Sequence, residues 1–251
     1  MERTRILREM GLGPVWKLRA VPAEAVLDVG EPQPASIPLA ESVPVADLNP
    51  PLATAPAMPG SPATAMGWAE LAAAVTACRL CPLCQNRKQA VLGVGDVNAD
   101  WLFVGEGPGA EEDQRGEPFV GQAGKLLDNM LAAIGLRRGQ NVYIANAVKC
   151  RPPENRTPTP EEVAACRPYL ERQIELLQPK LIVALGRPAA QTLLQAEVKI
   201  AAARGKLHDY RGIPLVVTYH PAYLLRTLLD KAKAWEDLCF MKRSMPTLRG
   251  D

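Results

Sequence analysis

Short apolar runs rich in β-branched residues recur along the chain from residue 101, and stretches with helical periodicity separate them. The runs show little polar alternation, which is typical of strands that are buried on both faces of a parallel sheet. Strands that alternate with helices predict an α/β fold of three layers (α/β/α) with a central, mainly parallel four-stranded sheet. The predicted strands are WLFVGEG (101–107), VYIANAVKC (142–150), KLIVALG (180–186) and LVVTYH (215–220), and the predicted helices cover about 68–77, 122–135, 160–177 and 187–195.

The same pattern divides the chain near residue 64. Residues 21–64 hold ten of the 24 prolines and no Lys or Arg, a composition that buries too little apolar surface to offset the entropy of ordering. We therefore expect a flexible Pro/Ala-rich linker at 21–66 and a compact domain at 67–251. Residues 1–20 predict a short N-terminal element, with a helix around Arg5–Met10.

Composition and charge narrow the class of protein. With 251 residues, 47% of them hydrophobic, the chain can form one sizeable core. Residues 1–63 carry 5 Lys or Arg and 7 Asp or Glu, which leaves 24 basic and 20 acidic residues for a mildly basic domain. No apolar run approaches the roughly 18 residues of a membrane span, and the start lacks the apolar core of a signal peptide. We expect a cytoplasmic protein without a membrane partner.

Four of the six cysteines are placed as metal ligands. Cys78 and Cys81 form a C-x-x-C pair before the first strand, while Cys150 closes the second strand and Cys166 follows after fifteen intervening residues. In a chain without a secretion signal, six cysteines favour metal ligation over disulfides. Thiolates from distant segments suit a tetrahedral all-cysteine site, so the pattern predicts an iron–sulfur cluster or structural zinc.

Polar residues occur at the carboxyl ends of three predicted strands. The first strand carries Glu106, the second Asn146 and the fourth His220. Because ligands bind beyond the carboxyl ends of parallel strands, these side chains are expected to converge on one edge of the sheet. Each also has an ordinary interpretation: Glu106 as a solvated acid, Asn146 as an amide that caps a turn, and His220 as a packed histidine. The other histidine, His208, falls in RGKLHDYRG, which predicts a hairpin and a surface position.

The glycine-rich loop at 105–121 lies between the two cysteine pairs. Its glycines loosely match a dinucleotide fingerprint, but no helix is expected to open at once, and the acids at 111–113 would repel a pyrophosphate. The Walker pattern of phosphate-binding loops also fails, so no nucleotide cofactor is expected. Phe119 in this loop is either packed into the core or a ring on which a planar ligand stacks.

Three segments, GEGPGAEEDQRGEPFVGQAGKLL, VYIANAVKCRPPENRTP and HPAYLLR, resemble the family 4 uracil-DNA glycosylases, the iron–sulfur members of the uracil-DNA glycosylase superfamily. The resemblance spans about residues 68–240 in unbroken order and includes the spacing of the cysteines. It implies a hydrolase of base excision repair. Such an enzyme flips uracil, the product of cytosine deamination, out of DNA and hydrolyses the N-glycosidic bond, which releases free uracil and leaves an abasic site.

The resemblance also implies ligands for a cofactor. The family's structural [4Fe–4S] cluster would be held by Cys78, Cys81, Cys150 and Cys166. A second C-x-x-C pair, Cys81 and Cys84, makes the register ambiguous, and the family's glycine at Gly93 selects Cys78 and Cys81. Cys84 is then spare, as is Cys239, which is expected in the core on a C-terminal helix.

For the reaction, the resemblance implies two catalytic residues: His220 stabilises charge that develops on uracil, and Glu106 positions water. The residues implied to bind uracil are Glu106, Gly107, Pro108, Glu112, Phe119, Asn146 and His220. The residues implied to contact DNA are Tyr223, Leu225 and Arg226, in a loop that also contains Leu224 and that wedges into the gap left by the base.

Uracil-containing DNA, single- or double-stranded, is therefore the expected partner of a monomeric protein that associates with the nucleoid through DNA. Residues 1–64 are a candidate docking segment for a repair or replication partner.

Two alternatives stay open. A four-cysteine zinc protein that only binds nucleic acid would be colourless and would release no base. A superfamily relative that forms a covalent adduct with DNA has a Gln at the position of Gly107 and a basic insert ending in His after the first motif, and this chain has neither.

Overall fold

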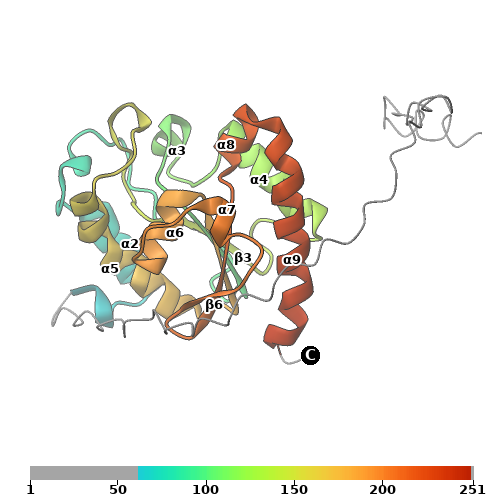
Figure 1. Cartoon of the computed structure of the whole chain (residues 1–251). Coiled ribbons are helices and arrows are strands. Elements are labelled where there is room, and N and C mark those ends of the chain that lie inside the picture. Colours follow the sequence, from blue (N-terminus) through green and yellow to red (C-terminus); the bar gives the residue numbers. More distant parts are fainter. Residues whose placement is uncertain (1–61, 250–251) are drawn as a thin grey trace, which may run out of the picture. The chain divides into compact units, whose positions relative to one another are not determined.

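The computed structural model describes residues 62–249, and Figure 1 shows the arrangement of its elements. The element predicted at 1–20 and most of the linker predicted at 21–66 lie outside the described residues. The end of that linker forms a 3-10 turn, η1 (Pro62–Ala65), in which Ala63 is buried. The described residues therefore include the last part of the predicted linker.

A single six-stranded sheet forms the centre of the domain, in the order β1-β3-β2-β4-β6-β5. Strands β3, β2, β4 and β6 run parallel, whereas β1 and β5 pair antiparallel at the two edges. The strands are β1 (Val94–Gly95), β2 (Trp101–Gly105), β3 (Val142–Asn146), β4 (Leu181–Leu185), β5 (His208–Tyr210) and β6 (Ile213–Thr218).

The α/β class and the parallel core are confirmed, and the predicted strand number is corrected from four to six. The two added strands lie at the edges and lack the apolar run that indicates a buried strand. β1 is only two residues long, and β5 has the sequence HDY with a partly exposed pattern. β5 and β6 together form the hairpin that was predicted around His208.

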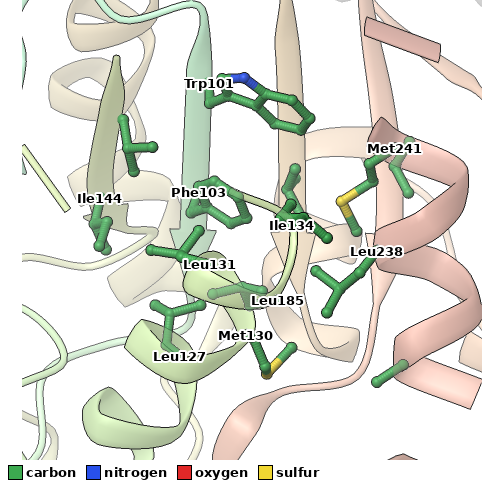
Figure 2. Packing of buried hydrophobic residues seen from close by; sticks show 14 of the residues in the cluster. Trp101, Phe103, Leu127, Met130, Leu131, Ile134, Ile144, Leu185, Leu238 and Met241 are labelled. Atoms are coloured by element: carbon green, nitrogen blue, oxygen red, sulfur yellow. The ribbon is translucent and has the colours of Figure 1, made fainter. Parts of the chain in front are cut away.

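Helices cover both faces of the sheet. Apolar residues of α4, α8 and α9 pack against one face, where Figure 2 shows Phe103 of the sheet beside Leu131 and Leu238 from the helices. Residues of α5, α6 and α7 pack against the other face. Within residues 62–249, no helix combines the length and the apolar character that a bilayer span requires. The helices are α2 (Trp68–Ala77), α3 (Ala110–Arg115), α4 (Gln122–Ala133), α5 (Pro160–Leu177), α6 (Arg187–Leu194), α7 (Ile200–Ala203), α8 (Pro221–Arg226) and α9 (Lys231–Arg249), with 3-10 turns η2 (Pro82–Cys84), η3 (Pro153–Asn155) and η4 (Leu228–Asp230).

Helix α3 corrects a detail of the predicted loop at 105–121. No helix was expected to open directly after GEGPG, yet α3 begins at Ala110 with Gly109 as its N-cap. Its acids occupy the first turn, where unpaired backbone N–H groups favour negative charge. The acids therefore begin a helix rather than prevent one.

Candidate functional site

The carboxyl ends of the four parallel strands open into one cleft of about 890 Å³. Glu106 follows β2, Asn146 ends β3, and His220 lies two residues after β6; all three line this cleft. Arg187, just after β4, lines it as well and was not predicted. The sequence could have indicated Arg187, because it follows the third predicted strand, β4, and ligands bind beyond the carboxyl ends of all parallel strands.

Most of the other predicted residues line the same cleft: Gly107, Pro108, Glu112, Phe119, Tyr223 and Arg226. The structure thus brings together segments that are more than a hundred residues apart in the sequence. Helices α3 and α8, which carry Glu112 and Tyr223, lie at the same end of the sheet in Figure 1.

Asn146 presents an amide inside this cleft. The residue is only 2% exposed, and its Oδ1 is buried without a hydrogen-bond partner among the described residues. A Cβ added to Gly105 would lie 2.4 Å from this oxygen and 2.6 Å from Cζ of Phe119. The amide and the aromatic ring therefore converge over a position that only glycine can occupy. A buried acceptor of this kind costs free energy unless a donor reaches it.

Phe119 is held in place through its backbone as well as its ring. Its φ of 56° is left-handed, and its carbonyl accepts a hydrogen bond of 2.8 Å from Arg138. A Cβ at Gly124 would lie 1.7 Å from that carbonyl oxygen, so the start of α4 must approach without a side chain. The ring lies 5.5 Å from the imidazole of His220, centroid to centroid, at an angle of 32°. Phe119 is both a buried core residue and a wall of the cleft.

Glu112 fastens the loop that carries Phe119 to the loop after β2. Its Oε1 accepts hydrogen bonds from the backbone N–H groups of Val120 and Gly121, at 2.9 and 3.0 Å. Its Oε2 accepts one from Gly109 at 3.1 Å. One carboxylate thus satisfies three backbone donors and fixes two separate loops against each other.

His220 is the N-cap of α8, and its Nδ1 accepts a hydrogen bond of 3.1 Å from the N–H of Ala222. Burial of the ring, together with the positive charge of Arg226, lowers its pKa to about 4. The imidazole is therefore neutral near pH 7. Because Nδ1 accepts, the single ring proton resides on Nε2, which makes Nε2–H the donor that the ring offers.

Glu106 lies half-buried between this cleft and a second, adjoining hollow. Burial raises the pKa of its carboxyl, while a hydrogen bond with Thr157 and the charge of Arg187 oppose that rise. The carboxyl is thus more basic than an exposed glutamate and remains able to hold a water molecule or stabilise a cation.

The cleft is bordered by positive charge. Four cationic residues line it, Arg156, Arg187, Lys199 and Arg226, against the two acids Glu106 and Glu112. One of the four, Arg156, forms a bidentate pair with Glu162 outside the cleft, at 2.8 and 2.7 Å. The balance favours an anionic ligand.

The predicted DNA-contacting loop forms helix α8 and its flanks. Leu224 is 1% exposed and packs in the core, whereas Leu225 is 41% exposed. Tyr223 stacks on Tyr219 with ring centroids 5.3 Å apart and lines the cleft. Of the two adjacent leucines, only Leu225 is available to a partner.

Five cysteines line a separate small cavity between α2, the segment that follows β3, and α5. They are the four predicted ligands, Cys78, Cys81, Cys150 and Cys166, together with Cys84. All are free thiols. Cys239, expected in the core, is half-buried on α9 and does not line this cavity.

One cationic side chain and one backbone N–H group donate hydrogen bonds to these sulfur atoms. Arg87 donates a hydrogen bond of 2.8 Å to Sγ of Cys150, and the backbone N–H of Lys149 donates one of 3.2 Å to Sγ of Cys166. Lys149 is 1% exposed, and burial lowers the pKa of its ammonium to about 8 while Cys166 and Cys150 oppose that shift. Buried cations beside thiols fit a centre that carries negative charge.

The thiols surround the cavity rather than meet at one point. Over residues 62–249, no three His, Cys, Asp or Glu side chains are arranged as ligands of a single metal ion. A lone tetrahedral zinc would draw its four sulfur atoms to about 2.3 Å from one centre. An all-cysteine donor set can hold either an iron–sulfur cluster or zinc.

Fold and site together define an α/β domain whose cleft is lined by a buried amide, an aromatic ring and an imidazole, with cationic side chains at its border. The family model described as the uracil DNA glycosylase superfamily matches residues 92–239, and the chain belongs to this superfamily.

The chain is also similar in sequence to individual uracil-DNA glycosylases. The chain is 51% identical to a type-4 uracil-DNA glycosylase of Thermotoga maritima over 154 residues, which cover 61% of this chain and 80% of the relative. It is 49% identical to a type-4 enzyme of Archaeoglobus fulgidus over 159 residues, covering 60% and 79%. A type-5 uracil-DNA glycosylase of Thermus thermophilus is 38% identical over 151 residues, covering 48% and 68%. The resemblance to family 4 that was drawn from the three sequence segments is confirmed.

Proposed function

We propose that this chain is a uracil-DNA glycosylase that releases free uracil from DNA by hydrolysis of the N-glycosidic bond and leaves an abasic site. The buried, unpartnered Oδ1 of Asn146 is the observation that carries the proposal. It lies beside the ring of Phe119 and in the same cleft as the neutral His220. The named type-4 relatives support the same activity.

Asn146 suits uracil better than cytosine. Uracil presents an N–H next to a carbonyl, and cytosine presents a bare ring nitrogen next to an amine. The Oδ1 of Asn146 would accept from the uracil N–H, and its amide NH₂ would donate to the adjacent carbonyl. Cytosine would leave the buried Oδ1 facing a second acceptor, which is costly. Phe119 would stack on the base, which reaches the pocket only after it is flipped out at a cost of roughly a few kcal/mol.

His220 and Glu106 would share the chemistry. Cleavage of the N-glycosidic bond moves its electron pair onto uracil and leaves a cationic sugar, which water then attacks. The Nε2–H of neutral His220 would donate to the charge that develops on the uracil 2-oxygen, the role of an oxyanion-hole donor. Glu106 would hold the attacking water and favour the cationic sugar. Gly107 and Pro108 would complete the wall of the pocket on the same loop.

The duplex would be held by α8 and its neighbours. Leu225 would fill the stack that the flipped base has left, with Tyr223 beside it at the pocket mouth. Arg226 would bind phosphate, as would the other cations of the cleft.

The cysteine cavity would hold a structural [4Fe–4S] cluster. Four thiolates, Cys78, Cys81, Cys150 and Cys166, are the donor set that such a cluster requires. When bound, the cluster supplies a covalent crosslink, with no part in the hydrolysis. The crosslink would join the segment before β2 to β3 and α5, and Arg87 and Lys149 would neutralise its charge. Lys149 also adjoins the reaction site, because its Nζ donates to the backbone carbonyl of Asn146 at 2.7 Å.

We further expect a monomer that acts on single- or double-stranded DNA in the cytoplasm, close to the nucleoid. Residues 1–64 would be available to dock a repair or replication partner.

The direct test is incubation of the purified protein with a single-uracil oligonucleotide in EDTA, followed by alkali. Strand breakage at uracil, with no breakage in matched cytosine and thymine oligonucleotides, is the expected result. A brown, folded protein that leaves uracil in place would show that the substrate is another lesion. A colourless protein that binds DNA without base release would favour the zinc alternative.

Glu112→Ala is expected to lower kcat/KM for uracil release by about 10- to 100-fold. The three backbone N–H groups that Glu112 holds would be released, and the loop carrying Phe119 would lose its fixed position. Steady-state kinetics and a thermal melt of the variant measure this. Glu117→Ala, an exposed acid of the same loop, is the matched control and should leave both values unchanged. Wild-type kinetics in Glu112→Ala would contradict the positioning role.

A further inference from the structure

Three leucines on helix α8 and the turn after it are exposed. Leu225 is 41% exposed, Leu228 63% and Leu229 89%. Among the described residues, seven large hydrophobic side chains are exposed, and these three lie within five positions of one another. A cluster of this kind next to a binding cleft indicates a contact surface, because single exposed leucines are ordinary and grouped ones are not.

The turn that carries two of these leucines has a fixed structure. Leu228–Asp230 form the 3-10 turn η4, directly between α8 and α9. The hydroxyl of Tyr223 donates to Oδ2 of Asp230 at 2.6 Å, and Lys233 Nζ forms an ion pair with Oδ1 at 2.8 Å. Tyr223 itself lines the cleft. The turn is thus anchored to the wall of the base pocket, so the two leucines keep a defined position relative to it.

Charge around the turn favours a polyanion. Arg226 precedes it, and Lys231 and Lys233 follow it. Asp230, the carboxylate within the turn, is engaged by Lys233 and by the Tyr223 hydroxyl, and these contacts lower its pKa. An apolar tip with cations on both sides matches a base stack that is bordered by phosphates.

We propose that the turn Leu228–Leu229 is a second apolar wedge, which inserts into double-stranded DNA next to Leu225 and grips the strand opposite the uracil. The proposal rests on the proposed glycosylase function. Leu225 would occupy the gap left by the flipped base, and η4 begins two residues after α8 ends, which keeps the second wedge close to Leu225. Single-stranded DNA has no opposing stack, so the wedge contributes only on a duplex.

The test compares one uracil oligonucleotide, single-stranded and paired opposite guanine, in the double variant Leu228→Ala and Leu229→Ala. On the duplex kcat/KM is expected to fall about tenfold or more, because alanine loses the apolar surface that each leucine would bury between the bases. On the single strand it changes less than twofold. Leu207→Ala, an exposed leucine beside β5, is the matched control and retains both activities. Equal values for wild type and double variant on the duplex, or equal losses on both substrates, would overturn the proposal.

A second readout separates the wedge from other uses of the same surface. 2-Aminopurine placed opposite the uracil fluoresces more strongly when it is unstacked, and the wild-type protein is expected to raise this signal while the double variant does not. Concentration-dependent dimerisation that the double variant abolishes, with an unchanged 2-aminopurine signal, would mark the turn as a protein–protein contact and overturn the proposal. Wild-type protein inactive on both substrates would instead contradict the glycosylase function itself.

Discussion

Replacing His220 by alanine is expected to lower kcat for uracil release by about 10²–10³-fold, the loss that accompanies removal of one oxyanion-hole donor. The Nε2–H of the neutral imidazole is the donor in question, because Nδ1 already accepts from Ala222. Under the proposed function Phe119 and Asn146 would still bind the base, so KM is expected to change little. Single-turnover kinetics with excess enzyme measures the chemical step directly.

The alanine variant also removes the N-cap of α8, and a second variant separates the two effects. Asparagine is a favourable N-cap residue, so His220→Asn should restore thermal stability. It lacks a donor at the position of Nε2 and should remain as slow as the alanine variant. Recovery of kcat in His220→Asn would show that His220 acts only as a cap. His208→Ala, whose ring contacts the carbonyl of Ala203, should retain full activity.

The pH dependence follows from the same contacts. The pKa of His220 is about 4 in the folded protein, against an ordinary value of 6.5. The unfolded chain therefore binds more protons between these values, and stability should fall as the pH decreases from about 6.5 towards 4. Thermal melts across this range should show a steeper loss for wild type than for His220→Asn. Between pH 6 and 8 the imidazole stays neutral, so activity should not titrate with this group.

The fold was predictable from the sequence where buried elements have a distinct pattern of apolar residues. The parallel strands are apolar on both faces, and helices α2 and α5 have the predicted bounds because their periodicity and end signals agree. The two edge strands lack an apolar pattern, since β1 is only two residues long with two paired positions and β5 is polar. Helix α3 was missed because its acidic first turn was considered only as a repellent for phosphate, not as a favourable helix start.

The site was predictable in part for the same reason. Parallel strands that end at one edge bring Glu106, Asn146 and His220 into one cleft, as the strand-end argument expected. Arg187 was overlooked because it begins a helix. The resemblance had named Leu225 rather than Leu224, and the packing of α8, which buries Leu224 and exposes Leu225, supplies the physical reason. Glu112 holds three backbone donors from two loops, and such contacts depend on how those loops meet in space.

Cys150→Ala is expected to abolish both the brown colour and the solubility of the protein. The thiol of Cys150 is 5% exposed, lines the cysteine cavity and accepts from Arg87, which also binds the carbonyls of Thr76 and Cys78. Loss of the cluster would leave the Arg87 guanidinium without the sulfur acceptor that it contacts at Cys150, and its remaining acceptors would be the two carbonyls. Iron analysis, visible absorption and a thermal melt measure the outcome.

Two other cysteine variants decide whether this loss is specific to the ligand set. Cys239 lies on α9, away from the cavity, so Cys239→Ala should keep iron content, colour and stability. Cys84 shares the cavity with the four predicted ligands, and Cys84→Ala tests the register of the first pair. Full iron content in Cys84→Ala, with loss in Cys78→Ala, would support Cys78 and Cys81 as the ligands. A soluble, coloured Cys150→Ala protein with four irons per chain would refute the assignment. Because Lys149 links the cavity to the carbonyl of Asn146, a partly folded variant without iron should also lose discrimination between uracil and cytosine.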